Sequence, residues 1–376
     1  MNRLITVYDD KESLNNVISE LSLNVDEVFY VYHHEVSRTS FDNITKVIRR
    51  YKNIDIRFIQ LKDDVEELND LIDENTIVDV GGAKYLSLLL FDLCKQRSNQ
   101  MIYYDDEENN IKDYRTHKVL DIDVIKLKIE DILQLKGGEI QSQLHHNVTD
   151  EENKEIVIKV VEDNLDKYND FIKYLSLVNG KLSDNNYRGN NTFAISRKDY
   201  EELSRENRFD HVEELFELRE DRIAFRNRKL KEFVTVAGTF LENYLFIKLN
   251  EINYFDDMKM SVIIDFSDDK YSHPVRCEID CLLVKNNHLL FTSCKSSKTT
   301  TGDLNEIYVH NKMFGNCLSK PIICVGEELD RRYPSIYAKA IELGIFIVDK
   351  SSFLAKGVAE TFIEIIEDAY KYDSII

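Results

Sequence analysis

The chain has 376 residues, of which 43% are hydrophobic and 31% charged, and its formal net charge is −20. A chain of this length usually forms more than one domain, and this composition is that of a globular protein. The excess of acidic residues excludes a protein that coats nucleic acid, so any nucleic-acid site must be local. No segment approaches the run of about 18 apolar residues that a membrane-spanning helix needs.

The first residues, MNRLITVYDD, lack the long apolar stretch of a secretory signal, and we expect a cytoplasmic protein. Five of the six cysteines come after residue 270, which does not suggest a disulfide framework in a chain of this length. Cys277 and Cys281 have the spacing of metal ligands, but no second pair of Cys or His follows at a matching distance. We therefore interpret the cysteines as reduced structural thiols.

Over the first 130 or so residues, strand-like apolar runs alternate with amphipathic helical runs. This pattern predicts a doubly wound parallel sheet covered by helices, in a domain spanning residues 1–150. The expected strands are 4–10, 27–34, 55–61, 76–80 and 100–106. Such sheets bind ligands beyond the carboxyl ends of their strands, where the strand order reverses. The loops after the first and fourth strands are therefore the candidate ligand site.

The remaining sequence divides into a charged stretch and a second α/β region. Residues 151–232 are highly charged and irregular, and we interpret them as a connector. From residue 233 to 376 we expect one long apolar helix (233–249), strands near 260–266, 278–285 and 288–295, and a helix at 303–316. A strand at PIICVG, another helix and a strand at GIFIVD follow. This region is the predicted second domain.

The most informative stretch is RCEIDCLLVKNNHLLFTSCKSSK (276–298), which reads as two strands joined by the turn KNNH. Side chains alternate along a strand, so Glu278 and Asp280 share one face of the first strand, and Ser293 and Lys295 share one face of the second. Carboxylates beside a lysine suit phosphodiester hydrolysis, because they hold a divalent cation that lowers the pKa of bound water.

This stretch resembles the PD-(D/E)xK nucleases, in which an acidic residue on one strand is followed by acid-x-Lys on the next. Asp280 matches the first acid and Lys295 matches the lysine. The resemblance also implies a glutamate from the preceding helix, which Glu242 matches, and a Mn²⁺ or Mg²⁺ ion held by Glu242, Glu278 and Asp280. The departure is Ser293, which stands where the motif has Glu or Asp, and Glu278 could compensate for it.

The same pattern has a purely structural reading, in which Glu278 and Asp280 are edge-strand charges and Lys295 extends into solvent. The order of elements favours the nuclease reading, because a helix with Glu242 precedes the hairpin and another helix follows it. We expect Glu306, on that following helix, to be a solvated charge rather than a ligand.

A basic segment, RIAFRNRKLKEF (222–233), precedes the long apolar helix. Its basic side chains could bind the phosphate backbone of a nucleic acid close to the metal; they are Arg222, Arg226, Arg228 and Lys229. Equally, they could belong to a solvated connector. The sequence alone leaves both readings open.

The segment VDVGGAKYLSLLLFDL (78–93) reads as a strand running through Gly81 and Gly82 into a helix. The first backbone N–H groups of such a helix form an anion site, to which Lys84 would add a positive charge. The alternative is a tight strand-to-helix turn with no ligand. The segment is neither a Walker A loop nor a dinucleotide fingerprint.

A Rossmann-like domain followed by this nuclease type resembles the cyclic-oligoadenylate-activated effectors of type III CRISPR antiviral defence. The resemblance implies an N-terminal CARF domain and a C-terminal restriction-endonuclease-like domain. It also implies a homodimer, a cyclic oligoadenylate activator, expected to be cyclic tetra-adenylate, and metal-dependent endonuclease cleavage of single-stranded or supercoiled DNA or of RNA. By position, the ligand-binding loop residues are Asp9, Asp10, Ser13, Gly81, Gly82, Ala83 and Lys84.

Three other functions fit parts of this sequence. The strongest is a ligand-binding regulator whose nuclease-like domain has lost metal binding, for which Ser293 is the main argument. A helix-turn-helix regulator fits less well, because residues 151–232 lack two compact apolar helices followed by a basic recognition helix. A dehydrogenase fits worst, because the first strand is not followed by the glycine fingerprint.

Overall fold

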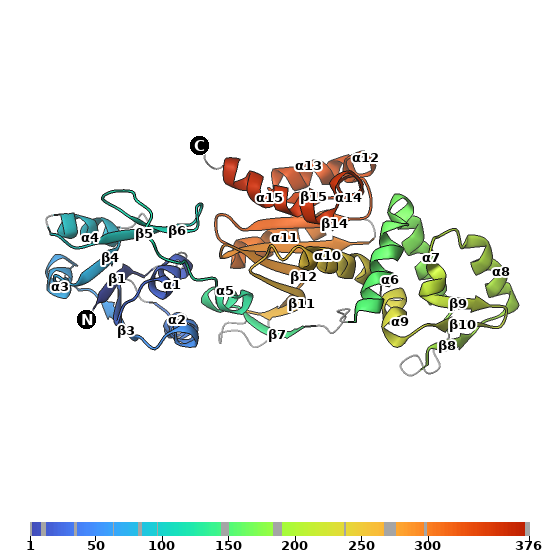
Figure 1. Cartoon of the computed structure of the whole chain (residues 1–376), viewed down its shortest axis with the longest axis horizontal. Helices are drawn as coiled ribbons and strands as arrows, with labels where there is room; N and C mark the ends of the chain where they lie inside the picture. Colours follow the sequence, from blue (N-terminus) through green and yellow to red (C-terminus); the bar gives the residue numbers. More distant parts are fainter. Residues whose placement is uncertain are drawn as a thin grey trace. The chain divides into compact units, whose positions relative to one another are not determined.

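The computed structural model describes residues 2–8, 13–33, 36–62, 64–81, 85–95, 97–143, 150–182, 190–236, 238–266, 276–296 and 299–372 (Figure 1). The chain forms two compact units. The first comprises residues 1–140, 265–275 and 286–288, and the second comprises 141–264, 276–285 and 289–376. Among the described helices, none has the length and apolar character required to cross a membrane.

The first unit is built on one sheet with the strand order β3-β2-β1-β4-β5-β6. Its strands are β1 (Arg3–Val7), β2 (Glu27–Tyr32), β3 (Asp55–Gln60), β4 (Thr76–Asp79), β5 (Met101–Asp105) and β6 (Asn110–Asp113). The first five strands are parallel, as predicted, and β6 pairs antiparallel with β5. The sequence of β6, NIKD, is too short and polar for periodicity to reveal it.

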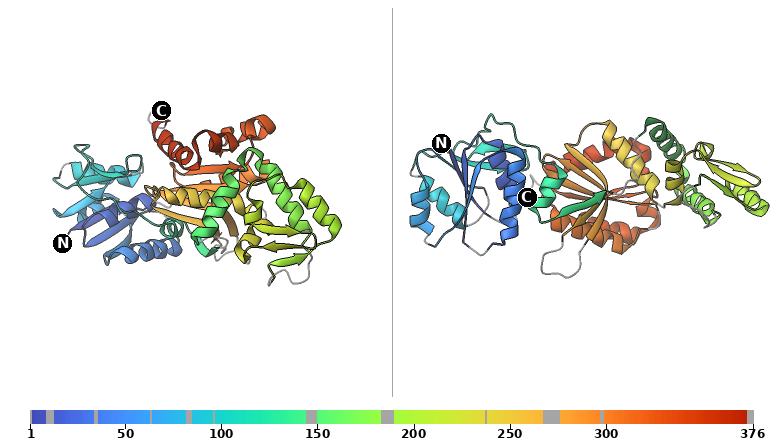
Figure 2. Two further views of the ribbon diagram at one scale, coloured as in Figure 1. Left: turned by 45° about the vertical axis from the view of Figure 1, so that its right-hand side comes forward. Right: turned by 90° about the horizontal axis from the view of Figure 1, so that it is seen from below.

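Helices cover both faces of this sheet, which confirms the doubly wound prediction (Figure 2). They are α1 (Ser13–Ser22), α2 (Arg38–Tyr51), α3 (Asp64–Leu71), α4 (Tyr85–Lys95) and α5 (Ile129–Leu135). In α2, Ile44, Val47 and Ile48 are buried at helical spacing, and the side chain of Ser37 caps the first turn by accepting from the Ser40 N–H. Helices α1 and α2 pack together, as do α3 and α4.

The second unit has a sheet with the order β15-β14-β13-β12-β11-β7. Its strands are β7 (Glu139–Gln143), β11 (Asp257–Asp265), β12 (Arg276–Lys285), β13 (His288–Lys295), β14 (Lys320–Val325) and β15 (Phe346–Val348). Strand β14 pairs parallel with both β13 and β15. Leu283, Phe291 and Ile322, on three neighbouring strands of this sheet, are fully buried.

The helices of the second unit differ from the prediction at one point. The expected helix 233–249 is wrong, because the chain forms α9 (Arg228–Thr235) and α10 (Thr239–Glu251) instead. Gly238, which lies between these helices, has a φ of +98°, a backbone conformation that residues other than glycine rarely adopt. The helices after the hairpin are α11 (Thr301–Phe314), α12 (Leu329–Arg332), α13 (Pro334–Glu342), α14 (Lys350–Lys356) and α15 (Val358–Tyr372).

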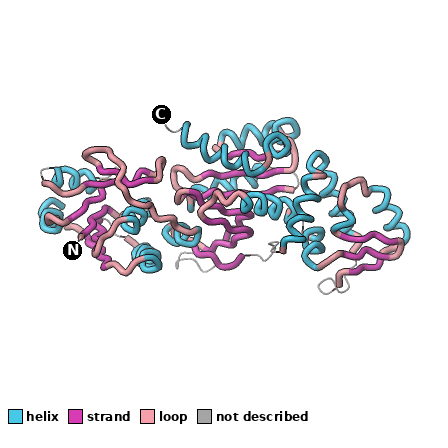
Figure 3. Tube along the Cα trace, in the orientation of Figure 1, coloured by secondary structure: helices cyan, strands magenta, loops and turns pink. Residues whose placement is uncertain are grey.

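The segment 151–232 forms helices and strands of its own within the second unit (Figure 3), and its buried apolar side chains join the core of that unit. Its elements are α6 (Glu151–Glu162), η1 (Leu165–Lys167), α7 (Tyr168–Gly180), β8 (Thr192–Ala194), α8 (Arg197–Glu206), η2 (Val212–Glu214), β9 (Phe216–Arg219) and β10 (Arg222–Phe225). The strands form an antiparallel sheet in the order β8-β10-β9. The rings of Phe193 and Phe216 both pack against Phe225, and α6 packs against α10.

Candidate active site

The β12–β13 hairpin places its polar side chains as the alternation predicted. Asn286 and Asn287 both have positive φ, 51° and 65°, which is the conformation of a two-residue turn matched to the twist of the strands. Across the hairpin, the Asp280 Oδ2 atom accepts hydrogen bonds from the Ser293 hydroxyl at 3.2 Å and from the Cys294 N–H at 2.7 Å. These bonds fix the orientation of the Asp280 carboxylate.

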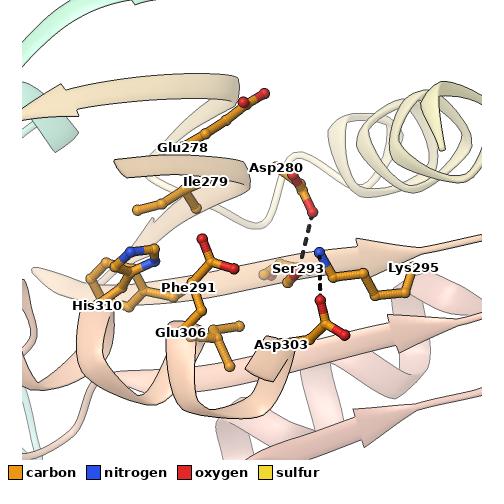
Figure 4. Close-up of a pocket in the computed structure, with 11 residues that line it drawn as sticks. Glu278, Ile279, Asp280, Phe291, Ser293, Lys295, Asp303, Glu306 and His310 are labelled. Atoms are coloured by element: carbon orange, nitrogen blue, oxygen red, sulfur yellow. Dashed lines mark hydrogen bonds and ion pairs between the residues drawn. The ribbon is translucent and has the colours of Figure 1, made fainter. Parts of the chain in front are cut away.

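A cavity of about 150 Å³ opens over this hairpin and α11. The polar side chains that line it are Glu278, Asp280, Ser293, Lys295, Asp303, Glu306 and His310. Figure 4 shows Lys295 extending along β13 toward Asp303, below the carboxylate of Asp280. The predicted hairpin residues therefore lie together around one pocket.

Lys295 is held between acidic groups. Its Nζ atom lies 3.4 Å from the Asp303 Oδ1 atom, and both side chains are largely buried. Burial lowers the pKa of the Lys295 ammonium, but the charges of Asp280, Asp303 and Glu306 more than offset this, and its pKa lies above the ordinary value. Lys295 is therefore a cation at neutral pH, suited to stabilise negative charge on a phosphate.

Glu242 lies close to this group of charges, on the first turn of α10. Burial raises its pKa to about 8, and the charges of Asp280 and Glu278 contribute to the increase. The pKa of Asp280 is also raised, chiefly by burial, despite its hydrogen bond from the Cys294 N–H. Carboxylates that repel one another in a buried site are stabilised in their charged forms by a bound cation.

The side chains of this site are of the chemical types that bind divalent metal ions. In the described parts of the chain, no three His, Cys, Asp or Glu side chains are gathered closely enough to hold a metal as they stand. Carboxylate oxygens are the ligands that Mg²⁺ and Mn²⁺ prefer, and Glu242, Glu278 and Asp280 supply them. Burial, together with the charges of Asp280 and Glu278, disfavours the charged form of Glu242, and a bound cation would favour that form.

Helix α11 contributes side chains whose role the sequence analysis missed. Asp303, Glu306 and His310 all line the pocket from this helix. Glu306 is exposed to solvent, as expected, but it also lines the pocket. Their spacing of three and four residues places them on one helical face, a signal that was present in the sequence.

Tyr168, at the start of α7, is a further residue near this site that the sequence did not point to. It is 1% exposed, and its hydroxyl has no hydrogen-bond partner among the described residues. Burial raises the pKa of Tyr168, and the charges of Cys294 and Glu242 raise it further, so its hydroxyl lies near the site. A Cβ atom on Gly326 would lie only 2.1 Å from the Tyr168 Cδ1 atom, which shows how closely this ring packs on the strand end.

The predicted basic residues do not line the pocket, and each has acidic neighbours. Arg226 pairs with Glu152 and lies 3.9 Å from Glu214. Arg228 and Lys229 both pair with Glu232, at 3.1 Å and 3.5 Å. Arg222 lies 4.0 Å from Asp221. Their positive charges are locally compensated, so they make a weaker phosphate-binding surface than their sequence density suggests.

In the first unit, the strand order reverses between the adjacent strands β1 and β4, as the predicted ligand site requires. Of the seven predicted loop residues, Ser13 and Gly81 are described. The others, Asp9, Asp10, Gly82, Ala83 and Lys84, lie outside the described residues.

Gly81 and Ser13 have polar surroundings at this end of the sheet. The Gly81 N–H donates to the buried Asp79 Oδ1 atom at 2.9 Å. A Cβ atom on Gly81 would lie 2.9 Å from the same oxygen, so the close approach requires glycine. Ser13 is 1% exposed, and its hydroxyl has no hydrogen-bond partner in the described part of the chain.

Comparisons with known proteins support the fold. No family model matches the sequence, and no curated protein matches it. The structure is similar to protein VC1899 from Vibrio cholerae, with a TM-score of 0.78 and 13% identity, over 98% of each chain. It is also similar to Can2 from Sulfobacillus thermosulfidooxidans in complex with cyclic tetra-adenylate, with a TM-score of 0.71 and 14% identity, over 97% of this chain and 99% of that one. The resemblance predicted from the sequence, a Rossmann-like unit followed by a restriction-endonuclease-like unit, is thus confirmed as a fold.

Proposed function

We propose that this protein is a metal-dependent endonuclease activated by a cyclic oligoadenylate, cyclic tetra-adenylate in the first instance, in type III CRISPR defence. The observation that carries the proposal is the pocket in which Asp280 and Lys295 meet across one hairpin. It is supported by the likeness, over 97% of this chain, to Can2, whose structure holds cyclic tetra-adenylate.

The residues that line the pocket, together with the neighbouring Glu242, divide into two roles in the proposed hydrolysis. Glu242, Glu278 and Asp280 would hold Mn²⁺ or Mg²⁺, which would supply a bound water of lowered pKa and polarise the phosphate. Lys295, kept protonated by its acidic neighbours and positioned by Asp303, would stabilise charge that develops on the phosphate.

The proposed activator site lies at the loops after β1 and β4. Asp9, Asp10, Ser13 and the segment 81–84 would contact the ligand there, and the polar environment of Ser13 and Gly81 supports this placement. A two-fold symmetric ligand fits a site shared by two copies of the chain, so we propose a homodimer in the cytoplasm. The ligand would activate cleavage by binding the active arrangement of the dimer more tightly than the inactive one.

The test is a cleavage assay with purified full-length protein. Labelled single-stranded RNA, single-stranded DNA and supercoiled plasmid would each be incubated with Mn²⁺, with cyclic tetra-adenylate or cyclic hexa-adenylate added in turn. We expect cleavage that depends on the ligand and is lost in Asp280→Ala. Ligand-independent cleavage, or cleavage that survives Asp280→Ala, would contradict the proposal.

A second candidate function is a ligand-binding regulator with a silenced nuclease domain. The observation that favours it is Ser293, which replaces the motif acid and donates its hydroxyl to Asp280. Calorimetry separates the two functions, because a silenced domain binds no Mn²⁺ whereas an active one binds it through Asp280. Tight binding of cyclic tetra-adenylate without Mn²⁺ binding would establish the regulator.

A further inference from the structure

The replacement of the motif acid by Ser293 leaves one side of the pocket without a carboxylate from β13. The Ser293 hydroxyl donates to the Asp280 Oδ2 atom, so it acts as a hydrogen-bond donor toward the site and adds no anionic oxygen. Divalent cations are bound by several oxygen or nitrogen ligands, of which carboxylates contribute the charge. A metal ion on this side of the pocket would have no carboxylate from β13, and the side chains of α11 line the pocket there.

Helix α11 presents Glu306 and His310 to this side of the pocket. They are four residues apart and therefore neighbours on one face of the helix. Figure 4 shows both side chains rising from α11 toward the strand that carries Glu278 and Asp280. The negative charge of Glu306 raises the pKa values of Asp280 and Lys295, which places its carboxylate within electrostatic reach of both.

His310 adds an independent observation that indicates a ligand. Its side chain is 8% exposed and lines the pocket, and it makes no hydrogen bond or ion pair to any described residue. Burial lowers the pKa of His310, so its imidazole is neutral at neutral pH, the form that binds metal ions.

We propose that Glu306 and His310 complete the metal site of this pocket, with Glu306 supplying the carboxylate that Ser293 lacks and His310 an imidazole nitrogen. The inference rests on the proposed nuclease function and assigns two ligands that the acid-x-Lys pattern does not contain. An imidazole nitrogen strengthens the binding of transition-metal ions more than that of Mg²⁺. The site should therefore prefer Mn²⁺ to Mg²⁺ because of His310.

Isothermal titration calorimetry of the full-length protein with MnCl₂ and MgCl₂ tests this inference without relying on cleavage. We expect Glu306→Gln to weaken the binding of both ions about tenfold or more. His310→Ala should weaken Mn²⁺ binding more than Mg²⁺ binding. Glu342→Gln, which removes an exposed glutamate on α13, is the matched control and should leave both affinities unchanged.

A rescue variant tests the substitution of one acid for another. Ser293→Glu restores an acid at the position where the motif has one. The double variant Ser293→Glu/Glu306→Gln should therefore bind Mn²⁺ more tightly than Glu306→Gln alone. Thermal unfolding of each variant identifies misfolding, and His310→Asn replaces His310→Ala if the alanine variant unfolds.

The outcomes distinguish the inference from the function on which it rests. Mn²⁺ binding that is lost in Asp280→Ala but unchanged in Glu306→Gln and in both His310 variants would overturn the inference and leave the proposed nuclease intact. If the unaltered protein binds no Mn²⁺ at all, the proposed metal-dependent function itself fails, and the two added ligands fail with it.

Discussion

The buried carboxyl group of Glu20 predicts that the first unit loses stability as the pH rises. Glu20, on α1, is 0% exposed, and its Oε2 atom accepts a hydrogen bond of 2.6 Å from the Tyr30 hydroxyl. Burial raises its pKa to about 8, although the Tyr30 hydrogen bond and the charge of Lys52 act in the opposite direction. The folded state thus holds a proton on Glu20 at pH values where the unfolded chain has released it.

The sign and size of the effect follow from this difference in proton binding. A raised carboxyl pKa gives full stability below the unfolded value of 4.5, and this stability is lost as the pH rises toward 8. Each pH unit in this window costs up to about 1.4 kcal/mol, so the loss between pH 5 and pH 8 is on the order of a few kcal/mol. Glu20→Gln keeps an acceptor for Tyr30 and removes the titrating group.

Differential scanning calorimetry of the full-length protein at several pH values from 5 to 8 measures this effect. We expect the transition of the first unit to move to lower temperature as the pH rises in the unaltered protein, and to move much less in Glu20→Gln. Glu74→Gln, at an exposed position of the same unit, is the control, and its transition temperature should fall with pH as steeply as that of the unaltered protein. Equal slopes in the unaltered protein and Glu20→Gln would refute the reasoning.

Two further substitutions test the packing of the second unit and the charges of the pocket. Gly326→Ala should destabilise the second unit by about 1–3 kcal/mol in denaturant unfolding, because the new Cβ would lie 2.1 Å from the Tyr168 Cδ1 atom. Gly180→Ala, whose Cβ would have no atom within 4 Å, should be neutral, and equal losses in the two variants would contradict this account. Asp303→Asn removes the charge that lies 3.4 Å from the Lys295 Nζ atom, and we expect cleavage to fall about tenfold while the amide still caps α11. An unchanged cleavage rate would show that Lys295 does not depend on this pair.

The amino-acid sequence alone determined the five parallel strands of the first sheet and the geometry of the β12–β13 hairpin. Both follow from local rules, since alternation assigns Glu278 and Asp280 to one face, and the residues Asn286 and Asn287 favour a tight turn. The hairpin then brings Asp280 next to Ser293 without help from distant parts of the chain. This is why the core of the candidate site could be predicted.

Only the tertiary structure decided which other side chains line the pocket or lie close to its charges. Glu306 and His310 carry an ordinary helical pattern, and their role depends on which face of α11 packs over the hairpin. Tyr168 comes from a segment that the sequence presented as a connector, yet its ring packs on Gly326 near Glu242. These placements arise from contacts between residues far apart in the chain, whose energies depend on the shape of the assembled core and not on the periodicity of any one segment.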